Sequence, residues 1–214
     1  MYRERSKSEK QPRHLWLLLI WLLYFIIWLL DQAVGNDNCW ITMMPVDSYI
    51  PFCEFFSVFY VLWFPSLAIL TLYTMLCDTP AFRRFMMYVL VTFVPTALAF
   101  LFIPNGMVIR AEIDPGKNFF TWIVSIIYSM DTPTNAFPSL HVIGCFGIFF
   151  TVYHSQTLQK KRWAQILTPI LMLLILVSTM LIKQHSLLDV LAAVPVSVVG
   201  YFLVYKLILP DRKL

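Results

Sequence analysis

Long apolar runs dominate the chain and are separated by short polar segments. Six of them are long enough to cross or nearly cross about 30 Å of hydrocarbon as helices, which rise about 1.5 Å per residue. They cover residues 15–30, 55–76, 85–103, 137–153, 163–182 and 187–209. Because backbone groups in lipid must be satisfied within their own segment, the pattern predicts an all-α polytopic membrane protein with six transmembrane helices.

A further apolar run, residues 119–129, is too short to span a bilayer. We expect it to form an interfacial or re-entrant segment before the fourth helix. Residues 1–14 are expected to form a basic N-terminal arm, and residues 15–214 the six-helix membrane domain. The first run also fits a signal peptide, since Ala33-Val34-Gly35 could form a cleavage site. We favour a retained helix, because cleavage would place the termini of the remaining five-span chain on opposite sides.

Composition supports the membrane assignment, since 59% of the residues are hydrophobic and 13% are charged. Soluble proteins carry about 25% charged residues, so nuclear, disordered and disulfide-scaffold proteins are excluded. The net charge of +4 does not indicate nucleic-acid binding, because the cations follow the topology. In the six-span arrangement thirteen of the sixteen Lys and Arg residues fall on one side, so both termini are expected to be cytoplasmic. The remaining three, Arg110, Lys117 and Lys183, fall on the outer side.

The four cysteines match no metal-binding pattern, and the chain has no glycine-rich nucleotide loop. We therefore expect no cofactor and no metal. Cys39 and Cys53 both lie in the loop predicted to be outside the cytoplasm, where a disulfide and two free thiols are both open alternatives. The sequence does not indicate an oligomeric state.

Five polar side chains are predicted to gather at the outer membrane boundary. They come from four separate segments and are Arg110, His141, Lys183, His185 and Asp189. An ionisable residue at membrane depth costs roughly 2.5–3.5 kcal/mol on insertion scales. Any one of them alone could be an interface residue with its charge directed to water. Five at one level predict a functional site.

The local spacing suggests a chemistry for this site. His185 and Asp189 are four residues apart, so one helical turn would place the carboxylate beside the imidazole and orient it as a nucleophile. An ordinary intrahelical contact is the structural alternative. Pro138-Ser139-Leu140-His141 resembles a helix start, whose free N–H groups bind phosphate. With Arg110 and Lys183 as cations, these residues predict a phosphoryl pocket without a metal.

These residues resemble the type-2 phosphatidic acid phosphatase superfamily of membrane lipid phosphatases and vanadium haloperoxidase relatives. Its motifs are KxxxxxxRP, PSGH and SRxxxxxHxxxD. The second motif is matched by Pro138-Ser139-Leu140-His141, and the third by Ser178-Thr179, His185 and Asp189. The first is reduced to Arg110-Ala111-Glu112. The resemblance covers about residues 100–190.

The resemblance implies a mechanism. His185 would attack phosphorus, Asp189 would support it, and His141 would protonate the leaving alkoxide. Arg110, Ser139 and the backbone at Leu140 would hold the phosphoryl oxygens, with no metal required and with the pocket open to the outer leaflet. The chain departs from the motifs at four positions: Ile103 for Lys, Ala111 for Pro, Leu140 for Gly and Thr179 for Arg.

Two phosphate-binding cations are thus missing, and Lys183 is a candidate replacement for one. The Pro-Ser-Leu-His form is similar to the branch that contains inositol phosphorylceramide synthases, which transfer a head-group phosphate to an alcohol. Glu112, Asp131 and Asn135 are candidates for binding a head group or acceptor, although Asp131-Thr132-Pro133 is also a turn signal.

We therefore expect a lipid phosphatase acting on a membrane lipid phosphate or diphosphate. The alternatives are a phospholipid head-group phosphotransferase and a non-catalytic lipid-binding or transport protein.

Overall fold

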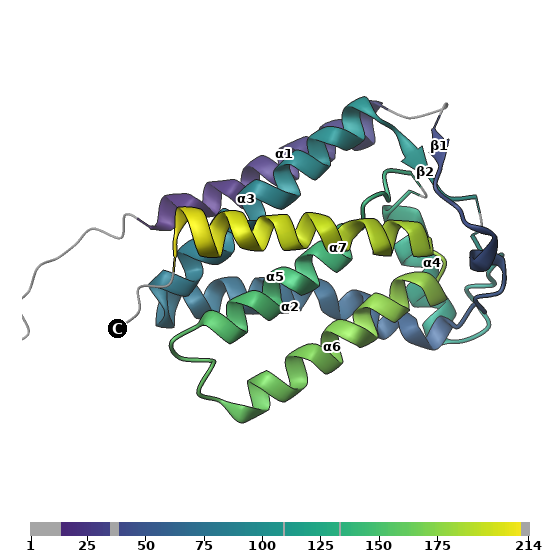
Figure 1. Cartoon of the computed structure of the whole chain (residues 1–214). Coiled ribbons are helices and arrows are strands. Elements are labelled where there is room, and N and C mark those ends of the chain that lie inside the picture. Colours follow the sequence, from purple (N-terminus) through teal and green to yellow (C-terminus); the bar gives the residue numbers. More distant parts are fainter. Residues whose placement is uncertain (1–13, 35–38, 109, 133, 211–214) are drawn as a thin grey trace, which may run out of the picture.

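The computed structural model describes residues 14–34, 39–108, 110–132 and 134–210 as a bundle of helices (Figure 1). The α-helices are α1 Leu19–Val34, α2 Ser57–Cys77, α3 Thr79–Phe102, α4 Phe119–Met130, α5 Leu140–His154, α6 Arg162–Leu181 and α7 Leu187–Tyr201. Shorter 3₁₀ segments are Leu15–Leu18, Pro45–Ser48 and Glu54–Phe56, and π-helical turns Phe202–Ile208 continue α7. The strands β1 Trp40–Ile41 and β2 Asn105–Gly106 pair in parallel.

Within the described residues, five helical segments are long and apolar enough to cross a membrane. They are Leu15–Ala33, Glu54–Cys77, Thr79–Phe102, Arg162–Leu181 and Leu187–Ile208. The predicted fourth span corresponds to α5, which has 15 residues and begins at Leu140 because Ser139 is its N-cap. The sixth span therefore stays a prediction. The short apolar run is a 12-residue helix, α4, and its interfacial or re-entrant position is likewise still a prediction.

Helix α3 begins six residues before the apolar run that predicts it, at Thr79. Asp78 is the N-cap, and its carboxylate accepts a hydrogen bond from Ala81 N at 3.2 Å. The same carboxylate accepts from Ser155 Oγ at 2.7 Å and Thr157 N at 3.2 Å. One buried carboxylate thus satisfies the start of α3 and ties it to the turn between α5 and α6.

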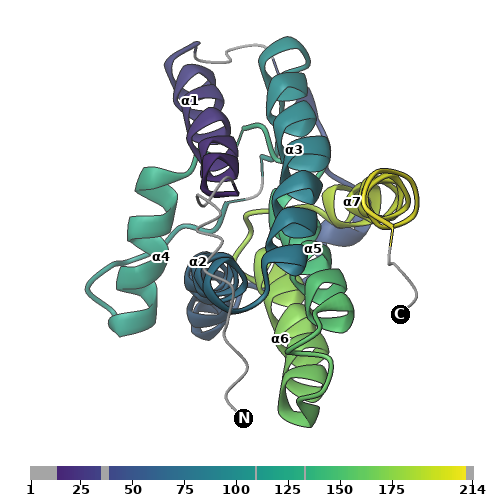
Figure 2. The same cartoon turned by 90° about the vertical axis from the view of Figure 1, so that its left-hand side faces the viewer.

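The most buried helix, α5, packs against α2, α3, α6 and α7, as Figure 2 shows. Its Val142 and Ile143 are fully buried, and Tyr88 of α3 donates a hydrogen bond to the Ile143 carbonyl at 3.1 Å. Gly147 of α5 and Gly200 of α7 both face the Tyr88 ring. Small residues let helices approach closely in a membrane, where the hydrophobic effect does not drive their association.

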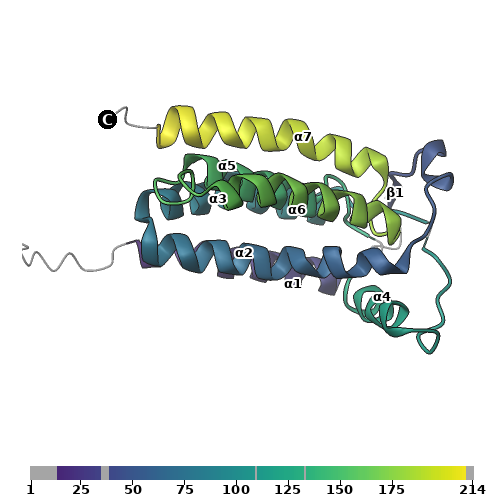
Figure 3. The same ribbon diagram turned by 90° about the horizontal axis from the view of Figure 1, so that it is seen from below.

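The two ends of the bundle differ in structure and in charge (Figures 1 and 3). One end, called here the loop end, carries β1, β2, α4 and the starts of α2, α5 and α7; the opposite end carries the α2–α3 and α5–α6 turns and the end of α7. Among the described cations, Arg83, Arg84, Lys160, Lys161, Arg162 and Lys206 belong to the opposite end, and Arg110, Lys117 and Lys183 to the loop end. The predicted charge separation is therefore present along the bundle. The basic arm at residues 1–13 lies outside the described residues.

Because α7 approaches α3 closely at Gly200, one added methyl group at this position is expected to lower the stability of the fold. In Gly200→Ala the new Cβ would lie 2.4 Å from Thr92 Cγ2, and we expect unfolding stability to fall by about 1–3 kcal/mol. Thermal unfolding of the purified protein in detergent measures this loss. Gly116→Ala is the control, because its Cβ would meet only an Asp114 side-chain atom at 3.3 Å in an exposed turn. Equal melting temperatures for the two variants would contradict the packing at Gly200.

Candidate active site

The structure brings the two candidate histidines into contact at the loop end. His141 lies in the first turn of α5, and His185 lies two residues before α7. Nδ1 of His141 is 3.3 Å from Nε2 of His185, and the ring centroids are 5.4 Å apart. Both side chains are more than nine-tenths buried. Two imidazoles that are 44 residues apart in the sequence are thus in direct contact in a buried environment.

The backbone around His185 fixes which of its ring nitrogens carries the proton. Nδ1 lies 3.1 Å from the carbonyl oxygen of Ala136. A carbonyl can only accept, so Nδ1 is the donor and Nε2 of the neutral ring keeps its lone pair. Ala136 is held in turn by Asn105, whose Oδ1 accepts from Ala136 N at 2.8 Å. The sequence reasoning missed both Ala136 and Asn105, since a backbone acceptor gives no residue-type signal.

Asp189 lies beside His185, but the two residues are not joined by the one turn of continuous helix that their spacing predicts. His185 precedes the helix, Ser186 is the N-cap of α7, and Asp189 completes a capping box with it. Asp189 Oδ2 accepts from Ser186 N at 2.8 Å and lies 3.5 Å from Nδ1 of His185. The Ala136 carbonyl is thus the closer partner of His185, and the fully buried carboxylate adds negative charge next to the ring.

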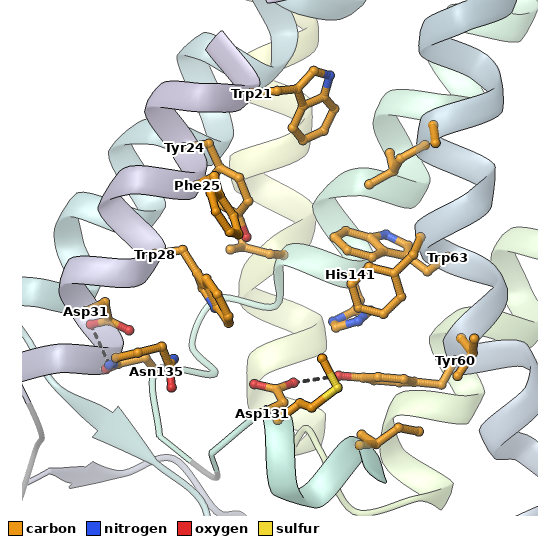
Figure 4. A pocket seen from close by; sticks show the side chains of 18 of the residues that line it. Trp21, Tyr24, Phe25, Trp28, Asp31, Tyr60, Trp63, Asp131, Asn135 and His141 are labelled. Atoms are coloured by element: carbon orange, nitrogen blue, oxygen red, sulfur yellow. Dashed lines mark hydrogen bonds between the residues drawn. The ribbon is translucent and has the colours of Figure 1, made fainter. Parts of the chain in front are cut away.

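Aromatic rings hold His141 on two sides. Its ring centroid is 4.3 Å from those of Tyr60 and Trp63, which are both on α2. Nε2 of His141 is buried and has no hydrogen-bond partner. Figure 4 shows the nitrogen end of the ring directed toward the space between Trp28 and Asp131. A buried polar atom without a partner is costly, by about 1–3 kcal/mol, so a ligand or water that hydrogen-bonds to Nε2 would be stabilised here.

That space is a cavity of about 920 Å³, lined mainly by α1, α2 and α4. Helices α1 and α2 both pack on α3, and the cavity lies between them. Figure 4 shows the α1 side chains on one wall and those of α2 on the other. At its polar end are Asp31, Asp131, Asn135, His141 and His185; away from them the walls are mostly aromatic and aliphatic. An apolar cavity with a few convergent polar groups is typical of a ligand site.

Of the predicted phosphate-binding residues, Leu140 lines the cavity, whereas Ser139 and Arg110 do not. Leu140 lines the cavity, at the N-terminus of α5. Ser139 is fully buried outside the cavity lining, and its Oγ accepts from Val142 N at 3.4 Å as a helix cap. Arg110 also lies outside the lining. Its guanidinium covers the Tyr128 ring and donates to Tyr128 O at 2.9 Å, to Gln184 Oε1 at 2.8 Å and to the Asp131 carbonyl.

Burial lowers the pKa of the Arg110 guanidinium, while the negative charge of Asp131 acts in the opposite direction. Arg110 thus stands behind Asp131 and away from the cavity. In this arrangement it organises the loop after α4.

The region around these histidines matches a protein-family model. Residues 113–213, which include His141, His185 and Asp189, match the PAP2 superfamily. This segment belongs to the PAP2 superfamily. No curated protein and no solved structure gives a significant match to the chain. Membership of the PAP2 superfamily supports a lipid enzyme of the phosphatase or phosphotransferase type, and the five apolar helices support an integral membrane protein.

The PAP2 match begins after Arg110 and Glu112, so the weakly matched first motif lies outside it. Glu112 is exposed and does not line the cavity. Asp131 and Asn135, inside the match, do line it. Asp131 Oδ2 accepts from Tyr60 Oη at 2.8 Å and from Gln184 Nε2 at 3.3 Å. Of the three head-group candidates, two therefore lie at the cavity and one does not.

Cys39 and Cys53 are not bonded to each other in the structure, and a disulfide between them stays an open alternative. Their backbones are held by different partners. Cys39 directly precedes β1, while the Cys53 N–H donates to Leu181 O at 2.9 Å at the end of α6. As for metals, no group of three or more His, Cys, Asp or Glu side chains suited to an ion occurs in the part of the chain that the structure describes.

Lys183 does not line the cavity, and its ammonium donates to the carbonyls of Asp47 and Ile50. Its φ of 58° places it in the left-handed region, directly after α6. Burial lowers the pKa of the Lys183 ammonium, and Asp47 opposes that shift. Asp47 also accepts from Leu187 N at 2.8 Å. Lys183 and Asp47 together therefore clamp the 44–50 loop onto the segment that carries His185.

Hydrogen exchange can distinguish a structural role of Lys183 in this clamp from a role as a phosphate ligand. In Lys183→Met we expect faster hydrogen exchange of the amides in residues 44–50, because two hydrogen bonds of about 0.5–1.5 kcal/mol each are removed. Exchange followed by mass spectrometry measures this, with Lys117→Met as the control, since Lys117 pairs with Glu54 on the surface. Unchanged exchange together with a raised KM for a lipid phosphate would instead make Lys183 a phosphate ligand.

Proposed function

We propose that the protein is an integral-membrane enzyme that releases the phosphoryl group of a lipid phosphate or diphosphate through a phosphohistidine on His185. The observation that carries this proposal is the contact of His141 Nδ1 with Nε2 of His185 at the polar end of an apolar cavity. Membership of the PAP2 superfamily supports the reaction class. A non-catalytic lipid-binding protein would have no need for this buried pair.

In the first step Nε2 of His185 attacks phosphorus. The lone pair is available because Nδ1 donates to the Ala136 carbonyl. The bond from phosphorus to the lipid oxygen breaks, and the electron pair leaves with that oxygen. Once the phosphoryl group has displaced the contact between the two rings, His141 acts as an imidazolium: it gives one ring proton to the leaving alkoxide and becomes the neutral imidazole.

In the second step a water oxygen attacks phosphorus. The N–P bond breaks and its electron pair returns to His185, while His141 accepts the proton of the water. Asp189, 3.5 Å from Nδ1 of His185, stabilises the positive charge that the ring gains when it bonds to phosphorus. The enzyme returns to its starting protonation state without a metal or cofactor.

The N-terminus of α5 supplies binding groups for the phosphoryl oxygens. A helix leaves its first N–H groups without intrahelical partners, and here the first two residues of α5, Leu140 and His141, line the cavity. The partial positive charge of the helix end favours an anion there. The apolar walls formed by α1 and α2 accommodate the lipid chains.

Transfer of the phosphoryl group to an alcohol is the second candidate. One observation favours it: no Lys or Arg is among the described residues that line the cavity. A dianionic monoester would meet few fixed positive charges, whereas a diester carries a single negative charge. Both reactions share the phosphohistidine and differ only in the second attacking oxygen.

We further propose six spans, with α5 as the short one, α4 at the membrane boundary, both termini in the cytoplasm and the histidines facing the other side. The segregation of the described cations to the end opposite the histidines supports this orientation.

The nucleophile assignment is tested with purified protein and lipid phosphates in the presence of EDTA. We expect His185→Ala and His141→Ala each to lower kcat by about 10²–10⁴-fold or more, and the wild type to form an acid-labile phosphoprotein that His185→Ala lacks. His154→Gln is the matched control, because His154 lies at the other end of the bundle, and it should keep wild-type activity.

Equal phosphate release by the wild type and His185→Ala would reject the proposed nucleophile. Complete loss of wild-type activity in EDTA would reject the metal-free reaction.

The orientation is tested with the native cysteines in intact cells. We expect an impermeant maleimide to label a variant that keeps Cys39 at the loop end (Cys53→Ser with Cys77→Ser). A variant that keeps the exposed Cys77 at the opposite end (Cys39→Ser with Cys53→Ser) should react only after the cells are opened. Cys145 is buried and stays in both. The reverse labelling pattern would place the histidines on the cytoplasmic side.

A further inference from the structure

The polar end of the cavity carries two carboxylates. Asp31, from the last turn of α1, and Asp131, directly after α4, both line it (Figure 4). Tyr24 of α1 lines the same cavity. Sequence reasoning did not single out Asp31, because it looks like the polar boundary of the first apolar run.

Neutral groups hold these carboxylates in place. Asp31 Oδ1 accepts from Asn135 Nδ2 at 2.7 Å, and Asp131 Oδ2 accepts from Tyr60 Oη at 2.8 Å. Neither side chain forms an ion pair with another described residue. The Arg110 guanidinium lies behind Asp131 and attracts its carboxylate, whereas Asp31 faces the cavity with no described cation paired to it. A ligand that supplies positive charge at this end would offset the cost of placing carboxylates there.

An independent observation shows that a ligand belongs at this end. Nε2 of His141 is buried and has no partner, and it is directed into the same space (Figure 4). Tyr60 connects the two features, because its ring packs on His141 with centroids 4.3 Å apart while its hydroxyl binds Asp131. The phosphoryl-transfer groups and Asp131 are thus separated by about one aromatic side chain.

The remaining lining residues indicate the sign and type of that ligand. Tyr24, Phe25 and Trp28 of α1 face Tyr60 and Trp63 of α2 across the cavity. Aromatic faces attract cations, and aromatic cages combined with carboxylates recognise ammonium and quaternary ammonium groups. A phosphomonoester with two negative charges would be repelled by Asp31 and Asp131.

We propose that the substrate is a phospholipid whose phosphoryl group carries a cationic amino-alcohol head group, with the ammonium bound by Asp31, Asp131 and the aromatic walls. This inference rests on the proposed phosphohistidine chemistry of His185, and it assigns to it the phosphodiester substrate of the second candidate instead of a phosphomonoester. Nε2 of His185 bonds to phosphorus, the bond from phosphorus to the glycerol oxygen breaks, and His141 protonates the diglyceride that leaves. Attack by water or an alcohol then releases the head-group phosphate from His185, and His141 takes up the proton.

The test uses the full chain in detergent micelles with four lipids that share the same acyl chains: phosphatidylcholine, phosphatidylethanolamine, phosphatidylglycerol and phosphatidate. We expect the wild type to prefer the first two. Asp31→Asn and Asp131→Asn should each lower kcat/KM for these two by about tenfold, the effect of about 1.4 kcal/mol, with little change for phosphatidylglycerol. The control is Asp114→Asn, which removes an exposed loop carboxylate that does not line the cavity.

The ratio of kcat/KM for phosphatidylcholine to that for phosphatidylglycerol is the decisive readout, because a purely structural defect lowers both values equally. An unchanged ratio in both variants, or a wild-type preference for phosphatidate, would overturn the head-group proposal. Comparison of the choline and ethanolamine lipids shows whether the amine is bound as a quaternary or a primary ammonium.

A binding measurement separates failure of this inference from failure of the proposed function. Thermal stabilisation of His185→Ala by phosphatidylcholine and by phosphatidylglycerol reports the head-group preference without turnover. If the wild type hydrolyses none of the lipids but this preference exists and is lost in Asp31→Asn, the catalytic proposal fails and the head-group site stands. If turnover occurs but binding shows no preference between the two lipids, the head-group proposal fails and the catalytic proposal stands.

Discussion

A single backbone hydrogen bond joins the two helix starts on which the site depends. The N–H of Ser139, the N-cap of α5, donates to the carbonyl of Asp189 in the first turn of α7 at 3.1 Å. His141 follows Ser139 by two residues, and His185 precedes Asp189 by four. The bond therefore brings two helix N-termini together, and with them the two imidazoles. Loss of this junction would separate the proposed nucleophile from its acid even if every helix stayed intact.

The charges around this junction are not arranged as expected for a site that binds phosphoryl oxygens, where cations would face the cavity. The cations of the loop end are turned away from the cavity, with Arg110 stacked on Tyr128 and Lys183 bound to loop carbonyls. The carboxylates of Asp31 and Asp131 face inward. Helix N-termini are then the main source of positive potential for the phosphoryl oxygens. Such a site is better suited to one negative charge with a positive charge nearby than to two negative charges.

Sequence alone identified the helices and the histidine pair because both leave strong one-dimensional signals. Hydrophobic runs follow from the thickness of the bilayer, and ionisable residues at membrane depth are rare enough to be noticed. The direction of a long side chain leaves no such signal, and for this reason Lys183 was expected in the pocket and lies in a clamp. Ala136 acts through its carbonyl, and Asp31 resembles an ordinary helix boundary, so neither could be recognised without coordinates.

The two halves of the chain contribute different parts of the site. The PAP2 segment supplies His141, His185 and Asp189, which carry the proposed chemistry. Most of the cavity wall comes from α1 and α2, which precede that segment. These two helices pack on α3 with the cavity between them, and α2 reaches the histidine junction through Tyr60 and Trp63, whose rings pack on His141. The superfamily match therefore covers the residues of the proposed reaction, while α1 and α2 contribute most of the wall, including Asp31, Trp28 and Tyr60, against which we propose that the lipid binds.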